Sequence, residues 1–264
     1  LLHVPTVYDL GKDGAGWDEI PQVWEIEEGP SFKNISFSPN GEFMACGGMK
    51  GTAILVKTKD WSLLKSFKFV DDSMCIGFSP DSCFMVSGDR TGLRIVNTAK
   101  PEVQTDVPAL NKPGVRCACF TSMTSGDFWL AIGDQKKHVL FFETDFSKME
   151  GSESTSACLK KKDTYDAGAL VNSIDFSNNG ELMAFGGKDN KVKVLRTSFD
   201  ANIPVQDWPL VWEYDVGVEL MVLRFSPPVS YHSFSQCLQT EKSDTYPTIQ
   251  NSAFSNIQKH SQTV

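Results

Sequence analysis

Histidine is scarce in this chain, although it is the side chain most often used for metal binding and proton transfer. The four that are present are His3, His138, His232 and His260, and none has a Cys, Asp or Glu at the spacing of metal ligands. The nucleophile motif Gly-x-Ser-x-Gly is also absent. The sequence therefore predicts no enzyme, no metal site and no cofactor.

Paired cysteines are lacking as well. The seven cysteines are an odd number and include no Cys-x-x-Cys, so they do not suggest a disulfide framework or a zinc site. Cys46, Cys75 and Cys83 lie in or beside predicted strands. We interpret them as buried, reduced thiols, which suggests a cytoplasmic, intracellular protein.

Long apolar runs and an excess of basic charge are missing too. No run approaches the ~18 residues of a membrane span, and no secretory signal is present. With 33 acidic against 25 basic residues the net charge is −8, which argues against a dedicated nucleic-acid binder. The chain begins Leu1-Leu2-His3 without a Met, as a fragment or an alternative transcript product would.

A repeated phrase organises what is present, and its clearest copy runs from Asp175 to Thr197. An apolar run ends at Phe176, an Asn-Asn-Gly turn follows, and a small-residue strand ends in Gly186-Gly187. A second turn leads into the alternating strand Val192–Leu195. Asn-Gly and Gly-rich turns between such runs are hairpin signals, so the unit is an antiparallel meander.

Copies of this unit recur along the chain at a period near forty residues. The aromatic residues that anchor them are separated by 41, 42, 56 and 49 residues; they are Phe37, Phe78, Phe120, Phe176 and Phe225. We expect the first four to be equivalent core positions on inner strands. A closing strand ends the same way in each complete unit, at Thr58, Thr98, Thr144 and Thr197. This period, with four short strands per unit, predicts an all-β fold: a β-propeller of four-stranded antiparallel blades.

The phrase Phe-Ser-Pro-Asn/Asp-Gly followed by Ala-x-Gly-Gly resembles the WD-repeat family of β-propellers, over roughly residues 5 to 228. The repeats are divergent, because the family's Trp-Asp pair is replaced by Val56-Lys57, Val96-Asn97, Phe142-Glu143 and Leu195-Arg196. The family's Asp, six residues before that Trp, is matched by Asp189 alone. Since the family's hydrogen-bonded cluster is missing, we expect these blades to rely on strand pairing and packing.

The propeller is expected to occupy residues 1–228 and to be followed by a polar tail. The predicted blades are 33–69, 74–108, 115–170 and 171–215, with partial blades at 5–27 and 219–228. The third blade carries an insertion at 145–168, predicted to be a mobile surface loop that either tolerates change or binds a partner. In the tail, 229–264, 16 of 36 residues are Ser, Thr or Gln, which predicts poor order.

Four complete blades fall short of the seven usual in the resembled family. The N-terminal segment supplies third and fourth strands, and Leu220–Pro227 supplies a first strand. A second strand has to come from the tail, where Tyr231–Leu238 is a poor candidate because it is rich in Ser and Gln. We therefore expect an incomplete or truncated ring whose open edges favour self-association or a partner; closure of the ring is the alternative.

Positive charge recurs in the turns between the second and third strands. We call these residues the basic arc: Lys50, Arg90, Lys136, Lys137, Lys188 and Lys191. Equivalent turns of successive blades share one rim of a propeller, so they are candidates for binding an acidic or phosphorylated segment. The alternative is that turns simply favour long polar side chains, and Asp71 and Asp72 can neutralise part of the arc.

Three functions remain open at this point. The first is a non-enzymatic scaffold that binds partner proteins through its rim loops, as the resemblance implies. The second is a regulatory propeller acting on a small GTPase or on membrane-trafficking machinery. The third is a propeller-fold hydrolase, for which Asp175 and Arg224 are the clear polar candidates on the first strands.

Overall fold

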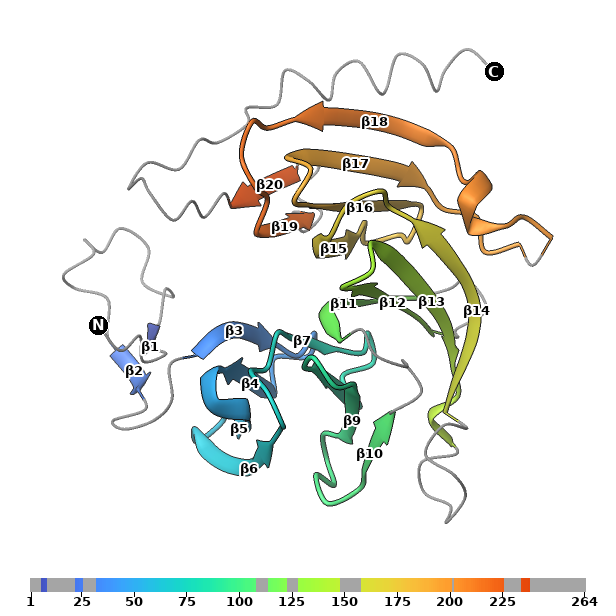
Figure 1. Cartoon of the computed structure of the whole chain (residues 1–264). Coiled ribbons are helices and arrows are strands. Elements are labelled where there is room, and N and C mark those ends of the chain that lie inside the picture. Colours follow the sequence, from blue (N-terminus) through green and yellow to red (C-terminus); the bar gives the residue numbers. More distant parts are fainter. Residues whose placement is uncertain are drawn as a thin grey trace.

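Four antiparallel sheets of four strands follow one another along the chain (Figure 1). The computed structural model describes residues 6–8, 22–25, 32–107, 114–122, 128–147, 158–200, 202–225 and 234–237. The first two blades consist of β3 (Phe32–Phe37), β4 (Phe43–Gly48), β5 (Thr52–Lys57), β6 (Ser62–Lys68), β7 (Cys75–Phe78), β8 (Phe84–Gly88), β9 (Leu93–Asn97) and β10 (Gln104–Val107). The next two consist of β11 (Val115–Ser122), β12 (Phe128–Asp134), β13 (His138–Thr144), β14 (Leu159–Asp166), β15 (Val171–Phe176), β16 (Leu182–Gly187), β17 (Lys191–Arg196) and β18 (Leu210–Asp215).

Two shorter sheets stand at the ends of this series. β1 (Thr6–Tyr8) pairs with β2 (Gln22–Glu25), and β19 (Val222–Phe225) pairs with β20 (Phe234–Cys237). No strand pairing joins the two shorter sheets within the described residues. The expected fold of four complete blades with a partial blade at each end is confirmed.

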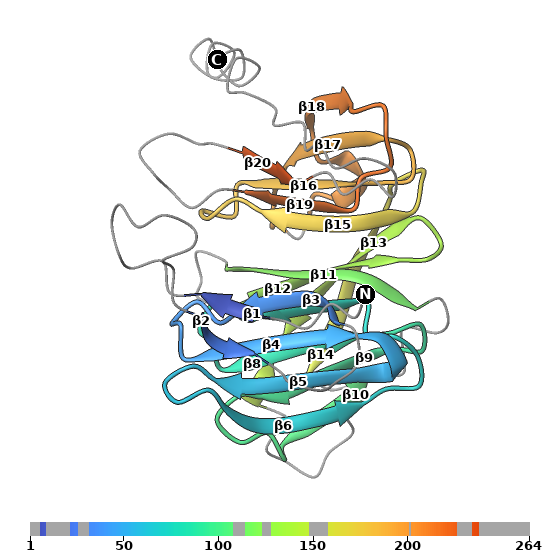
Figure 2. The ribbon, with the colours of Figure 1, turned by 90° about the vertical axis from the view of Figure 1, so that its left-hand side faces the viewer.

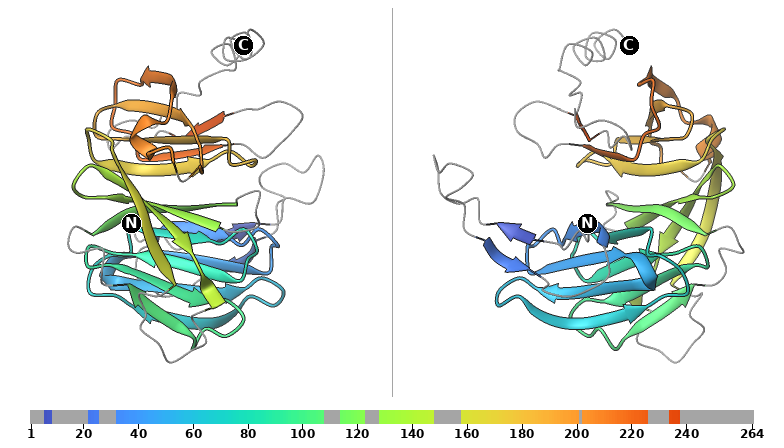
Figure 3. Two further views of the ribbon diagram at one scale, coloured as in Figure 1. Left: turned by 90° about the vertical axis from the view of Figure 1, so that its right-hand side faces the viewer. Right: turned by 60° about the vertical axis from the view of Figure 1, so that its left-hand side comes forward.

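The blades are arranged around an arc with their first strands innermost. β3, β7, β11, β15 and β19 contact one another in this order, and β6, β10, β14 and β18 lie at the periphery (Figure 1). Seen from the side, the strands of successive blades are stacked (Figure 2). Figure 3 shows that the arc stays open between β1–β2 and β19–β20.

The repeated phrase forms the same turn between the first and second strands of three blades. In the fourth blade, the Ser177 hydroxyl donates to Oδ1 of Asn179 and accepts from the Leu182 amide. Ser38 and Ser79 make the same contacts in the first and second blades. The turn ends in a left-handed residue, with φ of 70° at Gly180, a conformation that Gly adopts without steric cost.

In the same three blades, the threonine that closes the third strand is fixed to this turn. Thr58 donates its hydroxyl to the Gly41 carbonyl, and Thr98 donates to the Ser82 carbonyl at 2.8 Å. Thr197 makes the equivalent bond to Gly180. Thus the recurring Thr ties the end of the third strand to the turn that opens the second.

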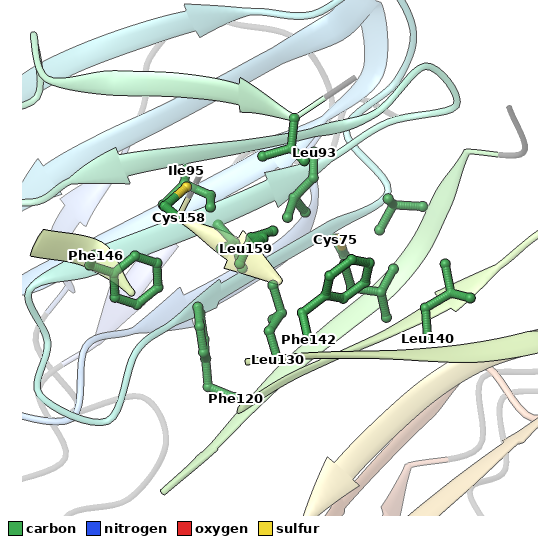
Figure 4. Close-up of a cluster of buried hydrophobic side chains, with 14 residues drawn as sticks. Cys75, Leu93, Ile95, Phe120, Leu130, Leu140, Phe142, Phe146, Cys158 and Leu159 are labelled. Carbon is green, nitrogen blue, oxygen red and sulfur yellow. The ribbon is translucent and has the colours of Figure 1, made fainter. Parts of the chain in front are cut away.

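Neighbouring blades are held together by apolar faces, as the second and third blades illustrate. Cys75 and Ile95 of the second blade are buried against Phe120, Leu130 and Phe142 of the third (Figure 4). Equivalent clusters join the first blade to the second and the third to the fourth. These clusters are the hydrophobic core, so each blade depends on its neighbour for burial.

Glycines at the ends of the second strands allow this close approach. A Cβ at Gly88 would lie 2.7 Å from the Cβ atom of Val115 on the next blade, and a Cβ at Gly47 would lie 2.8 Å from Cδ1 of Ile76. Contacts this short are sterically excluded. The Gly-Gly pattern therefore marks where one blade passes against the next.

Phe37 departs from the prediction that the anchoring aromatics occupy equivalent core positions. Phe78, Phe120 and Phe176 are buried as expected, but 48% of Phe37 is exposed. Each buried one packs on the blade that precedes it. Phe37 lies on the first complete blade, and among the described strands no further four-stranded sheet covers this face. Phe37 therefore has the predicted position in the repeat, but the prediction that it is buried was wrong.

Two segments expected to lack strands contain one each. β14 (Leu159–Asp166) falls within the predicted loop 145–168 and pairs with β13 over its length, so it is the outer strand of the third blade. β20 falls within the predicted tail, inside the candidate Tyr231–Leu238 that was considered poor, and it pairs with β19 despite its Ser and Gln content. The rest of 229–264 lies outside the described residues.

The expectation of buried, reduced thiols holds for most of the described cysteines. Cys46, Cys75, Cys117 and Cys158 are buried and free of disulfides. Burial raises the pKa of the Cys46 thiol to about 12, so it stays protonated at neutral pH. Cys83 is an exception, because it is exposed in the turn before β8.

Candidate functional site

The basic arc lies at the end of the sheets where second strands turn into third strands. Lys50 belongs to the 3-10 turn η2 (Met49–Gly51) between β4 and β5, and Arg90 lies between β8 and β9. Lys136 and Lys137 lie between β12 and β13; Lys188 follows β16 and Lys191 begins β17. The connections entering the next blade lie at the same end, since the Lys188 amide donates to Leu170 and the Ala167 amide to Lys137.

Carboxylates neutralise part of this arc, as expected for Asp71 and Asp72. Arg90 Nε lies 3.4 Å from Asp71, and Lys191 Nζ lies 2.6 Å from Glu213. Asp72 accepts the backbone amide of Lys50 and pairs with Lys33 at 3.0 Å. Exposed pairs of this kind contribute little stability, but they reduce the charge presented to a partner.

Four members of the arc keep an unpaired charge. Lys50, Lys136, Lys137 and Lys188 are exposed, and no described carboxylate lies within ion-pair distance of their ammonium groups. Lys136 and Lys137 are adjacent in one turn. The arc is thus not uniform: its free charge is concentrated on the third and fourth blades, with Lys50 apart on the first.

Asp89 is a residue that the sequence reasoning overlooked. Its Oδ1 accepts from the Thr91 amide and hydroxyl and from the Gly92 amide, while Oδ2 accepts from the amides of Val70 and Asp71. It therefore joins its own turn to the connection from the first blade. The signal was present in the sequence, since Asp89 and Asp134 stand one and two residues before the position of the family's Asp.

Asp134 organises the turn of the third blade in a similar way. Its Oδ1 accepts from the amides of Lys136 and His138, and its Oδ2 lies 3.0 Å from Nδ1 of His138. Because the carboxylate is buried beneath the turn, it fixes the backbone that carries Lys136 and Lys137. Two lysines of the arc are thus displayed by a rigid turn.

Cations on two third strands also tie blades together. Arg94 donates to the Lys68 carbonyl of the preceding blade at 3.0 Å and lies over the Phe69 ring. Lys193, at the equivalent place in the fourth blade, donates to the Ala167 carbonyl at 2.9 Å. The expectation that the blades depend on strand pairing and packing alone was therefore incomplete.

The groove beside Arg94 has a volume of about 320 Å³ and lies between the first and second blades. Arg94 forms a two-point pair with Asp106, and the Asp89 carboxylate is engaged by five donors. These charged groups are therefore already used within the protein, and the groove is poorly suited to an ionic ligand.

Asp175 and Arg224, the candidates for a hydrolase, hold β19 against β15. Asp175 Oδ2 accepts the Phe225 amide at 2.6 Å, and its Oδ1 lies 3.3 Å from the Cys119 thiol. Arg224 donates to the Leu223 carbonyl of its own strand at 2.8 Å and to the Ser173 hydroxyl of β15 at 3.4 Å. Burial raises the pKa of the Asp175 carboxyl above its ordinary value. Both residues serve the junction between blades.

The raised pKa of Asp175 predicts a pH-dependent stability. The folded state retains the Asp175 proton to higher pH than the unfolded state, so this residue's contribution declines as the pH rises above 3.8 and through the raised pKa. Asp175→Asn removes this ionisation but keeps an acceptor for the Phe225 amide. In urea unfolding across this range, the variant should gain stability relative to the parent with rising pH. A constant difference would contradict this.

Comparison with known proteins agrees with this geometry. The family model "WD domain, G-beta repeat" matches residues 157–195. The chain carries a WD repeat. The match begins just before β14, the outer strand of the third blade, and ends within β17 of the fourth. No curated protein matches the chain. The resemblance to the WD-repeat family is confirmed, and a WD repeat in a propeller-like fold supports a protein-interaction scaffold in general.

Metal binding and membrane spanning can be considered for the described residues. They hold no group of three His, Cys, Asp or Glu side chains arranged to bind a metal ion. Among them, no helix is long and apolar enough to cross a membrane.

Proposed function

We propose that this protein is a non-enzymatic scaffold that binds an acidic or phosphorylated segment of a partner protein on the rim bearing the basic arc. The observation that carries the proposal is the exposed charge of Lys136, Lys137 and Lys188 on neighbouring blades, which no carboxylate in the described part of the chain pairs. The turn holding the first two is fixed by the buried Asp134. Rigid display of charge lowers the entropic cost of binding.

The acidic character of the rest of the protein also supports a binding role for the basic arc. The net charge of −8 repels acidic ligands at long range, so a local basic surface is needed to select them. Extended partner segments fit a rim because its turns repeat from blade to blade. The alternatives of a small GTPase and of membrane-trafficking machinery name particular partners for such a rim, and no contact of these residues favours either. The hydrolase alternative has less support, because Asp175 and Arg224 form hydrogen bonds across the junction between β15 and β19.

A matched pair of charge reversals tests the proposal. Lys136→Glu/Lys137→Glu alters the arc, whereas Lys160→Glu/Lys161→Glu alters exposed lysines of β14 by the same net charge. Fluorescence anisotropy with labelled polyglutamate and phosphoserine peptides measures binding. The rim variant should bind about tenfold more weakly, as expected for two exposed charges worth up to ~1 kcal/mol each, with a flatter salt dependence.

The control variant should bind as the parent does. Neutral versions of the peptides, with Gln and Ser in place of Glu and phosphoserine, should not bind. If both variants bind equally weakly, the effect is due to overall charge and not to the basic arc. If the rim variant binds as the parent does, the basic arc takes no part in the interaction.

A further inference from the structure

The first and the last complete blade each leave part of one sheet face exposed. On the first blade, Ile35 and Phe37 of the inner strand lie opposite Cys46 and Met44. Cys46 and Met44 are fully buried on this face, but Ile35 and Phe37 are 49% and 48% exposed. On this face the innermost strand β3 therefore has no cover from the described residues, and Leu63 of the outermost strand β6 is 60% exposed as well.

The fourth blade shows the converse at the other end. Val192 and Val194 of β17 are buried under Leu220 and Leu223, which precede and belong to β19. Tyr214, which pairs with Val192 on the outer strand β18, is 46% exposed and stacked on Trp212 at 5.6 Å. Here the third strand β17 is covered, and the outermost strand β18 is exposed at Tyr214.

The two short sheets are complementary to these gaps. β19 is an innermost strand, because it contacts β15 as β15 contacts β11, so β19–β20 is the inner half of a blade. β1–β2 lies beside the first blade (Figures 1 and 2), where the two middle strands, β4 and β5, are the buried part of this face. Together they contain the four strands of one blade, but they remain separate sheets.

The packing between the blades determines whether β1–β2 and β19–β20 can meet within one chain. Three junctions between complete blades are filled by buried clusters, and the innermost strands make close contacts at each. Joining the halves within one chain requires a tighter angle at these junctions, which close-packed interiors resist. A second copy brings β1–β2 to β19–β20 and leaves every junction unchanged.

We propose that two copies of this chain associate head to tail, with β19–β20 of one copy and β1–β2 of the next completing a shared blade. The interface is heterologous: it joins the Tyr214 end of one copy to the Phe37 end of another. It covers Ile35 and Phe37 with an inner pair of strands and covers Tyr214 with an outer pair. It also pairs strand edges that are otherwise open.

Mixing two damaged chains tests this interface. Phe37→Asp damages one end and Tyr214→Asp the other, and both positions are exposed, so the monomers should fold. By sedimentation velocity, the parent should associate with rising concentration, and each variant alone should require at least about tenfold higher concentration. An equimolar mixture of the two variants should associate again, but no further than a heterodimer. Only the Tyr214 end of the Phe37→Asp variant and the Phe37 end of the Tyr214→Asp variant remain intact.

Val70→Asp is the control, since Val70 is 85% exposed on a rim connection away from both ends; this variant should associate as the parent does. Ile35→Asp serves as a second lesion if Phe37→Asp is not folded by circular dichroism. A parent that stays monomeric at all concentrations overturns the proposal. So does association that survives both lesions, or a mixture that fails to restore the dimer.

Discussion

Phe176→Ala should lower the free energy of unfolding by about 3–5 kcal/mol, the usual cost of truncating a buried Phe. Phe176 is only 7% exposed and packs in the cluster that joins the third and fourth blades, with Trp129 and Met183. The side chains around it are held by strand pairing on both sides, so the cavity cannot readily collapse. Equilibrium unfolding in urea measures the change.

Phe37 provides the control for this experiment within the same repeat. It occupies the equivalent position, ends the equivalent strand β3 and precedes the same turn, but about half of it is exposed. Phe37→Ala should therefore cost about 1 kcal/mol or less at concentrations where the chain is monomeric. Equal losses for the two variants would show that Phe37 is covered in solution.

Asp89→Ala should lower the free energy of unfolding by about 3 kcal/mol. The carboxylate is 1% exposed and accepts from five donors. Removing it breaks the part-buried hydrogen bonds from the Thr91 and Gly92 amides and releases the connection at Val70. Hydrogen exchange of the Val70 and Asp71 amides should accelerate together with the loss of stability.

Asp81→Ala is the matched substitution. Asp81 also accepts from a hydroxyl and a backbone amide in a turn of the second blade, through Ser79 and Cys83, but it is exposed. Water can replace its bonds, so the loss should be about 1 kcal/mol or less. If Asp89→Ala costs no more than Asp81→Ala, Asp89 does not hold the first two blades together.

The repeat predicted the blades because its residues act locally. Ser177, Asn179 and Gly180 form their turn from contacts within a few residues, and Thr197 returns to the same turn. Local hydrogen bonds of this kind are visible in a single sequence as a pattern of residue types. The same pattern predicted where the arc lysines lie, since they follow strands that the repeat defines.

Features that depend on neighbouring blades were harder to predict. The exposure of Phe37 depends on a missing sheet rather than on its own repeat. β20 forms from a polar segment because β19 offers it an edge, and β14 lies beyond an insertion that obscured its alternation. Asp89 resembled any turn aspartate; only the fold shows that its second oxygen reaches the preceding blade.

The open arc also has a consequence for how the chain folds. Among the described residues, the buried clusters that reach beyond one blade join blades adjacent in sequence, so stability approximates a sum of nearest-neighbour terms. Unfolding can then begin at either end and proceed inward without breaking a closed ring. Amides of the second and third blades should exchange last, and nascent blades can be stabilised one after another as they leave the ribosome.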